Sequence, residues 1–317
     1  MTTPGFNNPS YLVGQFGMPL WGVSGSPLPF TGNYFWVDET NGSDGNTGGP
    51  TDGFKTLTQA MSRCTSGNND VIFMTGSMHT AATIAWNLSH THLVGLSPPS
   101  QNGRARIAIT NAALTTVVTP LMNVTGTGCW FQNIEVFHGN AATTGEVAWA
   151  EAGGNNYYKN CNFIQTGNAI NSSLAASRAL TIAGNGENLF EDCTIGGDTE
   201  VRATNINATL EFLSGTARNV FKRCIFQSYS TLVGNVQVLI QANGMDRYAL
   251  FEQCTFHNFG TAMSVAITNS GGSPGGNVIL NNCISVGATV IATSGNIFVN
   301  QLSAAGGGTS YIGVLAT

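Results

Sequence analysis

A six-residue pattern recurs at nearly constant spacing through the second half of the chain. Its shared form is an apolar residue, two polar residues, a cysteine, a variable residue and a further apolar residue, which the last copy replaces with Ser285. The cysteines of five copies are Cys161, Cys193, Cys224, Cys254 and Cys283, and an earlier copy has Ile134 in their place. Successive copies are 27, 32, 31, 30 and 29 residues apart. A period near 30 residues predicts a solenoid in which each repeat stacks on the next.

The residue types in each repeat favour strands over helices. Phe, Ile, Val, Thr and Tyr occur in short runs that Gly and Asn interrupt, which is typical of strands joined by turns. The first apolar residue and the cysteine are three apart, so a straight strand would place them on opposite faces. A bend at the two polar residues between them would turn both inward. We therefore predict an all-β parallel β-helix of about 30 residues per coil, with these polar pairs at a solvent-facing corner.

One position of the repeat also predicts how the coils align. The residues that follow the first apolar residue alternate in charge: Lys159, Glu191, Lys222, Glu252. Coils that stack about 4.8 Å apart would set opposite charges side by side. Each exposed pair contributes only about a few tenths of a kcal/mol, so we expect the alternation mainly to fix the register. In the same stacking, the five cysteines form a structural ladder of buried thiols, which we interpret as core residues and not as ligands or nucleophiles.

The segment before the repeats predicts a cap over residues 34–69. Residues 34–37 resemble a strand, and residues 38–49 form a loop rich in Gly and Asn. Apolar side chains then recur at helical spacing: Phe54, Leu57, Ala60, Met61 and Cys64. A capping helix would cover the open end of the first coil, and we expect the β-helix itself to span residues 70–302.

The cap also carries a family resemblance. The run V-D-x-x-N-G-S-D-G-N-x-G at 37–48, followed by F-K-T-L-x-x-A at 54–60, resembles the N-terminal segment of pectin-lyase-like parallel β-helix proteins. Many phage-encoded β-helices have similar segments. With the repeats, the resemblance covers about residues 34–300. It implies a right-handed helix and, as in phage relatives, a homotrimer. It does not imply one function, because the superfamily includes lyases, hydrolases, adhesins and structural virion proteins.

Both ends of the chain lie outside the resemblance. Residues 1–33 hold half of the ten prolines, together with large apolar side chains that a disordered tail would normally lack. We interpret this segment as an extended anchoring arm that packs on the protein's own helix, on a second copy or on another surface. Its partner-binding candidates are Phe6, Tyr11, Phe16, Trp21 and Phe30. Residues 303–317 are expected to be a short C-terminal tail.

Composition narrows the function classes. Charged residues make up 9% of the chain, hydrophobic residues 42%, and the net charge is −5. The chain can bury a core, and it lacks the basic surface expected of a nucleic-acid partner. The sequence contains no apolar run long enough to cross a membrane and no N-terminal pattern of a secretion signal. We therefore expect reduced cysteines, assembly in a host cytoplasm and no cofactor.

Catalytic residue sets are not evident in the sequence. The resemblance implies, for the calcium-dependent lyases, a cluster of aspartates, but Asp70, Asp192, Asp198 and Asp246 do not recur at one coil position. His138, beside Gly139, matches only a fragment of the polygalacturonase pattern and is expected to be structural. For Glu191 and Asp192 we expect ion pairing with Lys159, Lys222 and Arg223. A glycosidase alternative remains open, in which Glu200, Glu211 and Glu252 approach one another across coils.

Two groups of residues are candidate metal ligands. His90 and His92 would share one face of a strand, with His79 nearby in sequence, but no carboxylate or cysteine completes the set. The loop oxygens of Asp38, Asn41, Asp44 and Asn46 could hold Ca²⁺, although turn formation explains these residue types as well. We therefore predict no metal site.

These observations leave three functional hypotheses. The leading one is a structural virion protein of a tailed bacteriophage, a capsid decoration or short head spike without catalytic activity, bound to the major capsid protein or another virion protein. The second is a tailspike-type depolymerase that cleaves surface glycans. The third is an adhesin that binds a surface glycan without cleaving it. Its candidate aromatic residues, most of them more simply explained as core residues, are Trp86, Trp130, Trp149, Tyr229 and Tyr248.

Overall fold

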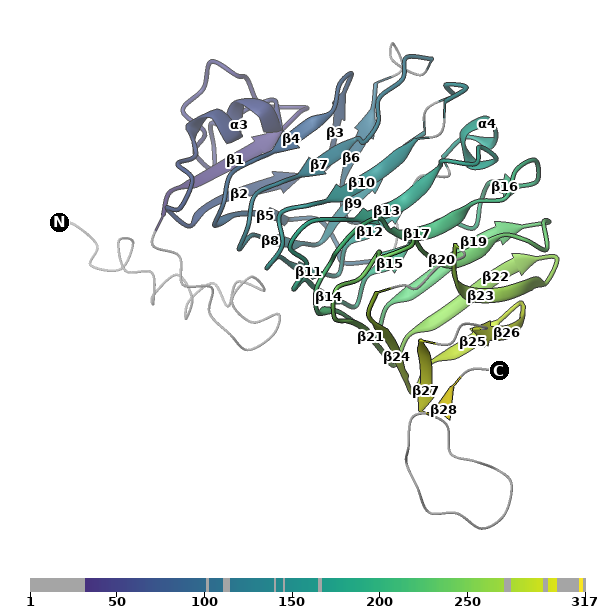
Figure 1. Ribbon diagram of the computed structural model, residues 1–317. Helices are drawn as coiled ribbons and strands as arrows, with labels where there is room; N and C mark the ends of the chain where they lie inside the picture. The colour runs from purple at the N-terminus through teal and green to yellow at the C-terminus, as the bar shows by residue number, and fades with distance from the viewer. Residues whose placement is uncertain are drawn as a thin grey trace.

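Parallel strands wind into a solenoid of about 7 turns, with about 29 residues in each turn. The computed structural model describes residues 32–100, 103–110, 115–139, 141–144, 146–164, 167–270, 275–292, 296–300 and 314–315. Figure 1 shows the coils stacked from the capping helix at one end to the last strands at the other. Residues 1–31 of the proposed arm, including Phe6, Tyr11, Phe16, Trp21 and Phe30, lie outside the described residues, as does most of the C-terminal tail.

The strands of successive coils form three sheets, here called sheets I, II and III. Sheet I contains β1 (Tyr34–Asp38), β2 (Asp70–Thr75), β5 (Thr91–Gly95), β8 (Trp130–Gln132), β11 (Tyr157–Lys159), β14 (Leu189–Glu191), β18 (Asn219–Lys222), β21 (Tyr248–Glu252), β24 (Asn277–Asn281), β27 (Ile297–Asn300) and β28 (Val314–Leu315). Sheet II contains β3 (Ser77–Thr80), β6 (Ala105–Ile109), β9 (Ile134–Phe137), β12 (Asn162–Ile164), β15 (Thr194–Ile195), β19 (Ile225–Ser230), β22 (Thr255–Gly260) and β25 (Ile284–Val286), and β16 (Val201–Arg202) pairs with β19. Sheet III contains β4 (Ile84–Trp86), β7 (Met122–Val124), β10 (Val147–Glu151), β13 (Arg178–Ile182), β17 (Ala208–Phe212), β20 (Val236–Ile240), β23 (Met263–Asn269) and β26 (Ala288–Ala292). Each coil runs through sheets I, II and III in that order, which confirms the predicted parallel β-helix.

The corner between sheets I and II is made by a single residue in the left-handed conformation. It directly precedes the cysteine position of the repeat, with φ between 51° and 55°, in Asn133, Asn160, Asp192, Arg223, Gln253 and Asn282. The bend turns both flanking side chains inward, so that Tyr158 and Cys161 are buried, as the spacing predicts.

The solvent-facing position predicted for these corners is correct only in the later coils. Arg223, Gln253 and Asn282 are exposed, whereas Gln132, Asn133 and Lys159 are buried. Near the buried corners, Arg104 from the loop before β6 donates hydrogen bonds to the backbone and side-chain oxygens of Asn160, both at 2.7 Å. The repeat pattern does not predict this contact, because Arg104 lies outside the repeated segments.

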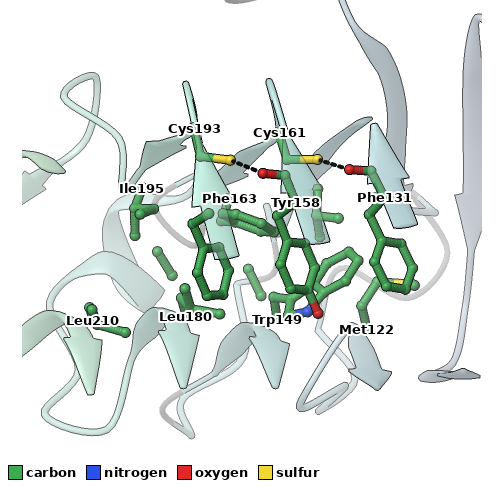
Figure 2. Close-up of a cluster of buried hydrophobic side chains, with 14 of the residues drawn as sticks. Met122, Phe131, Trp149, Tyr158, Cys161, Phe163, Leu180, Cys193, Ile195 and Leu210 are labelled. Carbon is green, nitrogen blue, oxygen red and sulfur yellow. Dashed lines mark hydrogen bonds between the residues drawn. The ribbon is translucent and has the colours of Figure 1, made fainter. Parts of the chain in front are cut away.

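The interior is organised around a column of stacked aromatic rings. Phe131, Tyr158, Phe190, Phe221 and Phe251 come from successive coils of sheet I, with neighbouring ring centroids 4.4–5.1 Å apart and ring planes within 7° of parallel. Trp149 of sheet III packs edge-on against Phe131 and Tyr158, as Figure 2 shows. Each aromatic pair contributes about 0.5–1.5 kcal/mol beyond the burial of its area.

The five repeat cysteines lie beside this column, one in each coil. Every thiol donates a hydrogen bond to the backbone carbonyl of the aromatic residue in the preceding coil: Cys161 to Phe131, Cys193 to Tyr158, Cys224 to Phe190, Cys254 to Phe221 and Cys283 to Phe251, with distances of 3.2–3.5 Å. Figure 2 shows the first two of these contacts. All seven cysteines of the chain are free thiols.

Charge alternation in sheet I is confirmed by the register. Lys159 pairs with Glu191, Glu191 with Lys222, and Lys222 with Glu252 on neighbouring strands. The Lys159 ammonium lies 3.1 Å from the Glu191 carboxylate and 2.5 Å from that of Asp192. A shift of one residue in the pairing of neighbouring sheet I strands would break these contacts and turn the aromatic side chains outward.

A second ladder, of asparagines, joins sheets III and I. Asn156 and Asn188 directly precede strands of sheet I, and Asn219 is the first residue of β18. The side-chain oxygen of Asn188 accepts the backbone N–H of Asn156 at 3.0 Å, and that of Asn219 accepts the backbone N–H of Asn188 at 3.4 Å. These amides satisfy buried backbone donors where the chain turns between sheets.

The predicted capping helix is present as α3 (Leu57–Arg63), and a second, four-residue helix, α4 (Ala169–Ser172), was not predicted. Thr56 caps α3 by accepting the backbone N–H of Gln59, and the Asp44 carboxylate accepts the N–H groups of Lys55 and Thr56. Neither helix is long and apolar enough to cross a membrane, and the same holds throughout the described ranges.

The aromatic column should dominate stability. Phe221 is fully buried between Phe190 and Phe251, so we expect Phe221→Ala to lower the free energy of unfolding by about 3–5 kcal/mol. Ile206→Ala, a control at a loop side chain that is 64% exposed, should change it by about 0.5 kcal/mol or less. Urea titration followed by circular dichroism measures both, and equal losses would contradict the assigned role of the column.

Candidate functional site

A groove crosses the outer face of sheet II in its middle coils. It encloses a volume of about 540 Å³, within the range of small-ligand sites. Its lining comes from four strands and one loop: Arg106 of β6, Phe137 of β9, Ile164 of β12, Gln227 of β19, and Gly197, Asp198 and Thr199 after β15. Side chains from consecutive coils therefore build the site.

Parallel pairing fixes the floor of the groove. Phe137 and Ile164 are register neighbours on β9 and β12, and both point outward because Val136 and Phe163 beside them point into the core. Gly139 and Gly167 let the backbone approach the Phe137 ring. A Cβ atom added at Gly167 would lie 2.5 Å from that ring. The floor of the groove is therefore apolar, and the backbone at Gly139 and Gly167 packs closely against its Phe137 ring.

The wall of the groove begins at Gly196, where φ is +95°. A Cβ atom there would lie 2.1 Å from the carbonyl oxygen of Gln227, so glycine lets the chain turn off the sheet at this point. The following residues carry Asp198 and Thr199, whose side chains are exposed. An acidic and a hydroxyl group therefore face the apolar floor.

An ion pair closes one end of the groove. The Arg106 Nε lies 2.5 Å from Glu135 Oε1, and the guanidinium sits 5.1 Å from the centre of the Phe137 ring. Glu135 is fully buried, and its second oxygen accepts a hydrogen bond from the Asn162 amide at 3.2 Å. The Arg106 side chain remains 34% exposed, so it can still donate to a ligand.

This arrangement is suited to binding. An apolar floor with a guanidinium, a carboxylate, a hydroxyl and an amide at its edges resembles the lining of a site for a polar, ring-shaped ligand. Glycosidase chemistry needs two carboxyl groups on either side of the scissile bond. Of the groove's described residues, only Asp198 has an exposed carboxylate, since Glu135 is held by Arg106.

The carboxylates predicted from sequence lie elsewhere. Glu191 and Asp192 are on the corner of sheet I, in contact with Lys159 and Arg223, which confirms that they form ion pairs. Burial alone would raise the pKa of Glu191, but hydrogen bonds from Tyr157, Arg223 and Lys159 outweigh it and lower the pKa to about 2. A residue this acidic is a poor general acid or base at neutral pH.

The approach of Glu211 and Glu252 across coils, which the glycosidase alternative would need, does not occur. Glu211 is on sheet III, where it pairs with Arg178 at 2.7 Å, and Glu252 is on sheet I beside Lys222. Position in the coil, not closeness in sequence, decides which side chains meet, and these two positions belong to different sheets.

His79, His92 and His138 form hydrogen bonds or ion pairs with neighbouring residues. The Nδ1 atom of His92 accepts the backbone N–H of Trp130 at 3.0 Å, and burial lowers the pKa of His92 to about 4. His138 is fully buried, and its Nε2 donates toward Glu146, 2.6 Å away, and the Val118 carbonyl. His79 pairs with Glu39.

The candidate calcium loop is held together by its own oxygens. Asp38 accepts the backbone N–H groups of Thr40 and Asn41, and Asn46 donates to the Gly53 carbonyl. Within the described ranges, no three His, Cys, Asp or Glu side chains are grouped so that they could hold a metal ion.

Two of the proposed glycan-stacking aromatics are inaccessible. Trp86 and Trp149 are fully buried, and Trp130 packs against Tyr157 with ring centroids 4.9 Å apart. Tyr229 and Tyr248 are half-buried. Sequence reasoning missed Arg106 and Phe137, although the alternation of inward and outward residues in β9 was a signal that Phe137 faces out.

The fold can be compared with solved structures. A rhamnogalacturonan lyase matches with a TM-score of 0.60 and 15% identity, covering 84% of this chain and 73% of the lyase. The pectate lyase Pel9A matches with a TM-score of 0.54 and 15% identity, covering 88% of this chain and 82% of the lyase.

This chain has the pectin-lyase-like parallel β-helix fold. No protein-family model and no curated protein matches its sequence. At 15% identity the likeness to the two lyases shows the fold alone. The resemblance in the cap and repeats therefore led to the correct fold.

Unlike Glu191, the Glu151 carboxyl group has a raised pKa, which is typical of catalytic acids. Burial raises the pKa of Glu151 to about 7, against hydrogen bonds from Gly154, Tyr158 and Asn156 that lower it. Its side chain is 1% exposed and faces the interior beside Tyr158, away from the groove. Glu151 is therefore a buried acid without access to substrate.

Glu151 should make stability depend on pH. Its pKa is higher in the folded chain, at about 7, than the ordinary value of 4.5, so its contribution is fully present below pH 4.5 and is lost as pH rises through 7. The loss should be about 3 kcal/mol. We expect Glu151→Gln to remove this dependence, since its amide can still contact Tyr158 and Asn156.

Urea titrations between pH 4 and pH 8 would measure this difference between wild type and variant. Glu187→Gln, at an exposed glutamate paired with Arg218, is the control and should keep the wild-type profile. An unchanged profile in Glu151→Gln would contradict the assignment.

Proposed function

We propose that this chain is a structural β-helix protein that binds a surface glycan in the groove of sheet II without cleaving it. The observation that carries the proposal is the groove itself: Phe137 and Ile164 form an apolar floor, and Arg106, Asp198 and Thr199 supply polar groups around it. Sugars present both apolar ring faces and hydroxyl groups, and this lining complements both.

The fold gives independent support. Two solved structures that share it are named as a rhamnogalacturonan lyase and a pectate lyase, so the fold accommodates polysaccharides elsewhere. A depolymerase is the second candidate, favoured by the same likeness. The binding role is preferred because the groove offers a single exposed carboxylate and Glu135 is locked in an ion pair.

The proposed setting is the virion of a tailed bacteriophage, with the protein as a capsid decoration or short head spike. Support comes from the N-terminal run at 37–48, which resembles phage-encoded β-helices, and from a surface polarity that rests on amides and hydroxyls, with 9% charged residues. In this proposal residues 1–33 anchor the β-helix to the major capsid protein or another virion protein.

A homotrimer belongs to the same proposal. Ile225, Phe259, Ile284 and Val286 are exposed on sheet II in the last coils. Strands β19, β22 and β25, which carry them, contain no Asp, Glu, Lys or Arg. An uncharged apolar sheet face of this kind is typical of a surface that packs against another chain.

Glycan binding should depend on the groove. Asp198→Ala removes an exposed hydrogen-bonding group and should weaken binding at least fivefold, about 1 kcal/mol. Asp246→Ala, an exposed aspartate outside the groove, should bind like wild type. A glycan array followed by calorimetry on the bound oligosaccharide measures both, with assays for released reducing ends in parallel. Absence of any bound glycan would refute the proposal, and released reducing ends would select the depolymerase.

The assembly can be tested by light scattering. The full chain should have the mass of a trimer, and Ile284→Lys should shift it toward monomer because the charge would be buried in the interface. Ile206→Lys, at a side chain 64% exposed on a loop, should leave the mass unchanged. Only monomer, both for the full chain and without its first 33 residues, would contradict the trimer.

A further inference from the structure

A second hydrophobic cluster lies outside the interior, on the outer face of sheet I in the first coils. Its centre consists of Val71, Phe73 and Val94, which are at most 2% exposed and do not belong to the main core. Ile72 and Leu93, which alternate with them along β2 and β5, do belong to the main core. The three side chains therefore point away from the interior.

Five aromatic rings, here called the outer patch, form most of this cluster: Tyr34 and Trp36 of β1, Phe73 of β2, Trp130 of β8 and Tyr157 of β11. The Phe73 ring packs against those of Tyr34 and Trp36, with ring centroids 6.1 Å and 5.1 Å apart. All of these rings except Phe73 keep part of their surface exposed. Small hydrophobic clusters outside a main core typically lie beneath a further stretch of chain.

The outer patch ends where charged side chains begin. Parallel pairing places Phe73, Val94, Gln132 and Lys159 in one row on this face, and the row continues with Glu191. The face is thus apolar in the first coils and charged in the later ones. A segment that covers the first coils should therefore be apolar and uncharged.

A hollow beside Trp36 has room for a side chain. It encloses about 160 Å³ between the sheet, from which Trp36, Asp38 and Thr75 line it, and the loop that carries Pro50 and Thr51. A cavity of about 150 Å³ accepts a benzene molecule. The hollow is therefore large enough for one aromatic or aliphatic side chain.

The segment just before β1 has the reach and the composition to cover the outer patch. The described chain begins at residue 32, close to Tyr34 at the start of β1. The strands of the patch, β1, β2, β5, β8 and β11, lie next to one another (Figure 1), so four strand spacings of about 19 Å in total are crossed by about six extended residues. Residues 1–31 contain no Asp, Glu, Lys, Arg or His. Large apolar side chains in the second half of this segment are Phe16, Leu20, Trp21 and Phe30.

We propose that residues 16–31 fold back over the outer patch of their own chain and place one apolar side chain in the hollow beside Trp36. A segment tethered at the edge of its binding surface has a high effective concentration there, which favours it over a second copy or a free ligand. Its three prolines lack backbone N–H groups, so it is suited to contacts through side chains and not to pairing as a further strand. The placement is independent of the groove on sheet II, and it leaves residues 1–15 for the proposed anchoring contact.

Photo-crosslinking in the full chain tests this placement. With p-benzoylphenylalanine in place of Trp21, we expect cross-links to β1, β2, β5, β8 or β11, identified by mass spectrometry. A mixture of isotope-labelled and unlabelled chains, assembled together, shows whether each cross-link lies within one chain. Cross-links between two copies, cross-links to other strands, or no cross-link at all would overturn the proposal.

Proteolysis measures how firmly the segment is held. Chymotrypsin cleaves after aromatic residues, and cleavage after Trp21 requires the segment to leave the outer patch. Trp36→Ala removes a ring of the patch and one wall of the hollow, so it should speed this cleavage at least fivefold, about 1 kcal/mol. Tyr248→Ala, at a half-buried ring on β21 of the same sheet, is the control and should leave the rate unchanged. Equal rates in wild type and Trp36→Ala would overturn the proposal, and the cross-linking test does not depend on how either variant folds.

Discussion

Hydrogen bonding between successive coils is the constraint on which the rest of this structure depends. Apart from β28, which pairs antiparallel with β27, the strands of sheets I, II and III pair in parallel and in register with those of the neighbouring turns. Residues about 29 positions apart therefore lie directly over one another. The aromatic column, the row of thiols and the alternating charges of sheet I are three results of the same pairing. A side chain in this fold meets the side chains at the equivalent position of the neighbouring coils. A contact that is favourable between two coils is therefore repeated along the axis.

The same constraint explains which features could be predicted from sequence. The fold followed from the spacing of Cys161 to Cys283, and the corner followed from the offset between Tyr158 and Cys161, because both depend on local geometry repeated once per coil. The asparagine ladder was equally periodic, but Asn156, Asn188 and Asn219 were hidden among many turn asparagines. The predicted exposure of the corners at Asn133 and Lys159 was wrong because chain outside the repeat packs there: Asn133 donates to the carbonyls of Gly95 and Ser97, and Arg104 donates to Asn160, next to Lys159.

The groove was the least predictable part. Arg106, Phe137, Asp198 and Gln227 come from four of five successive coils and share no motif. They meet only because sheet II stacks their strands and the chain turns off the sheet at Gly196. Glu211 and Glu252 illustrate the opposite error, in which acidic residues that look available in sequence lie on different sheets. In a solenoid, the coil position of a residue must be known before its chemistry can be judged.

The aromatic column has a definite end, and this gives the molecule a mechanical polarity. Phe251 is the last ring, and Leu280 occupies its place in the following coil. Toward the N-terminus Leu93 precedes Phe131 in the same row, but Trp86 and Trp149 of sheet III pack edge-on against Phe131, and Arg104 joins its own coil to Asn160 two coils further on. A pulling force applied along the axis would therefore peel the C-terminal coils first, one turn at a time, while the N-terminal half stayed wound. A protein held at its N-terminal end would keep its firmest part next to the point of attachment.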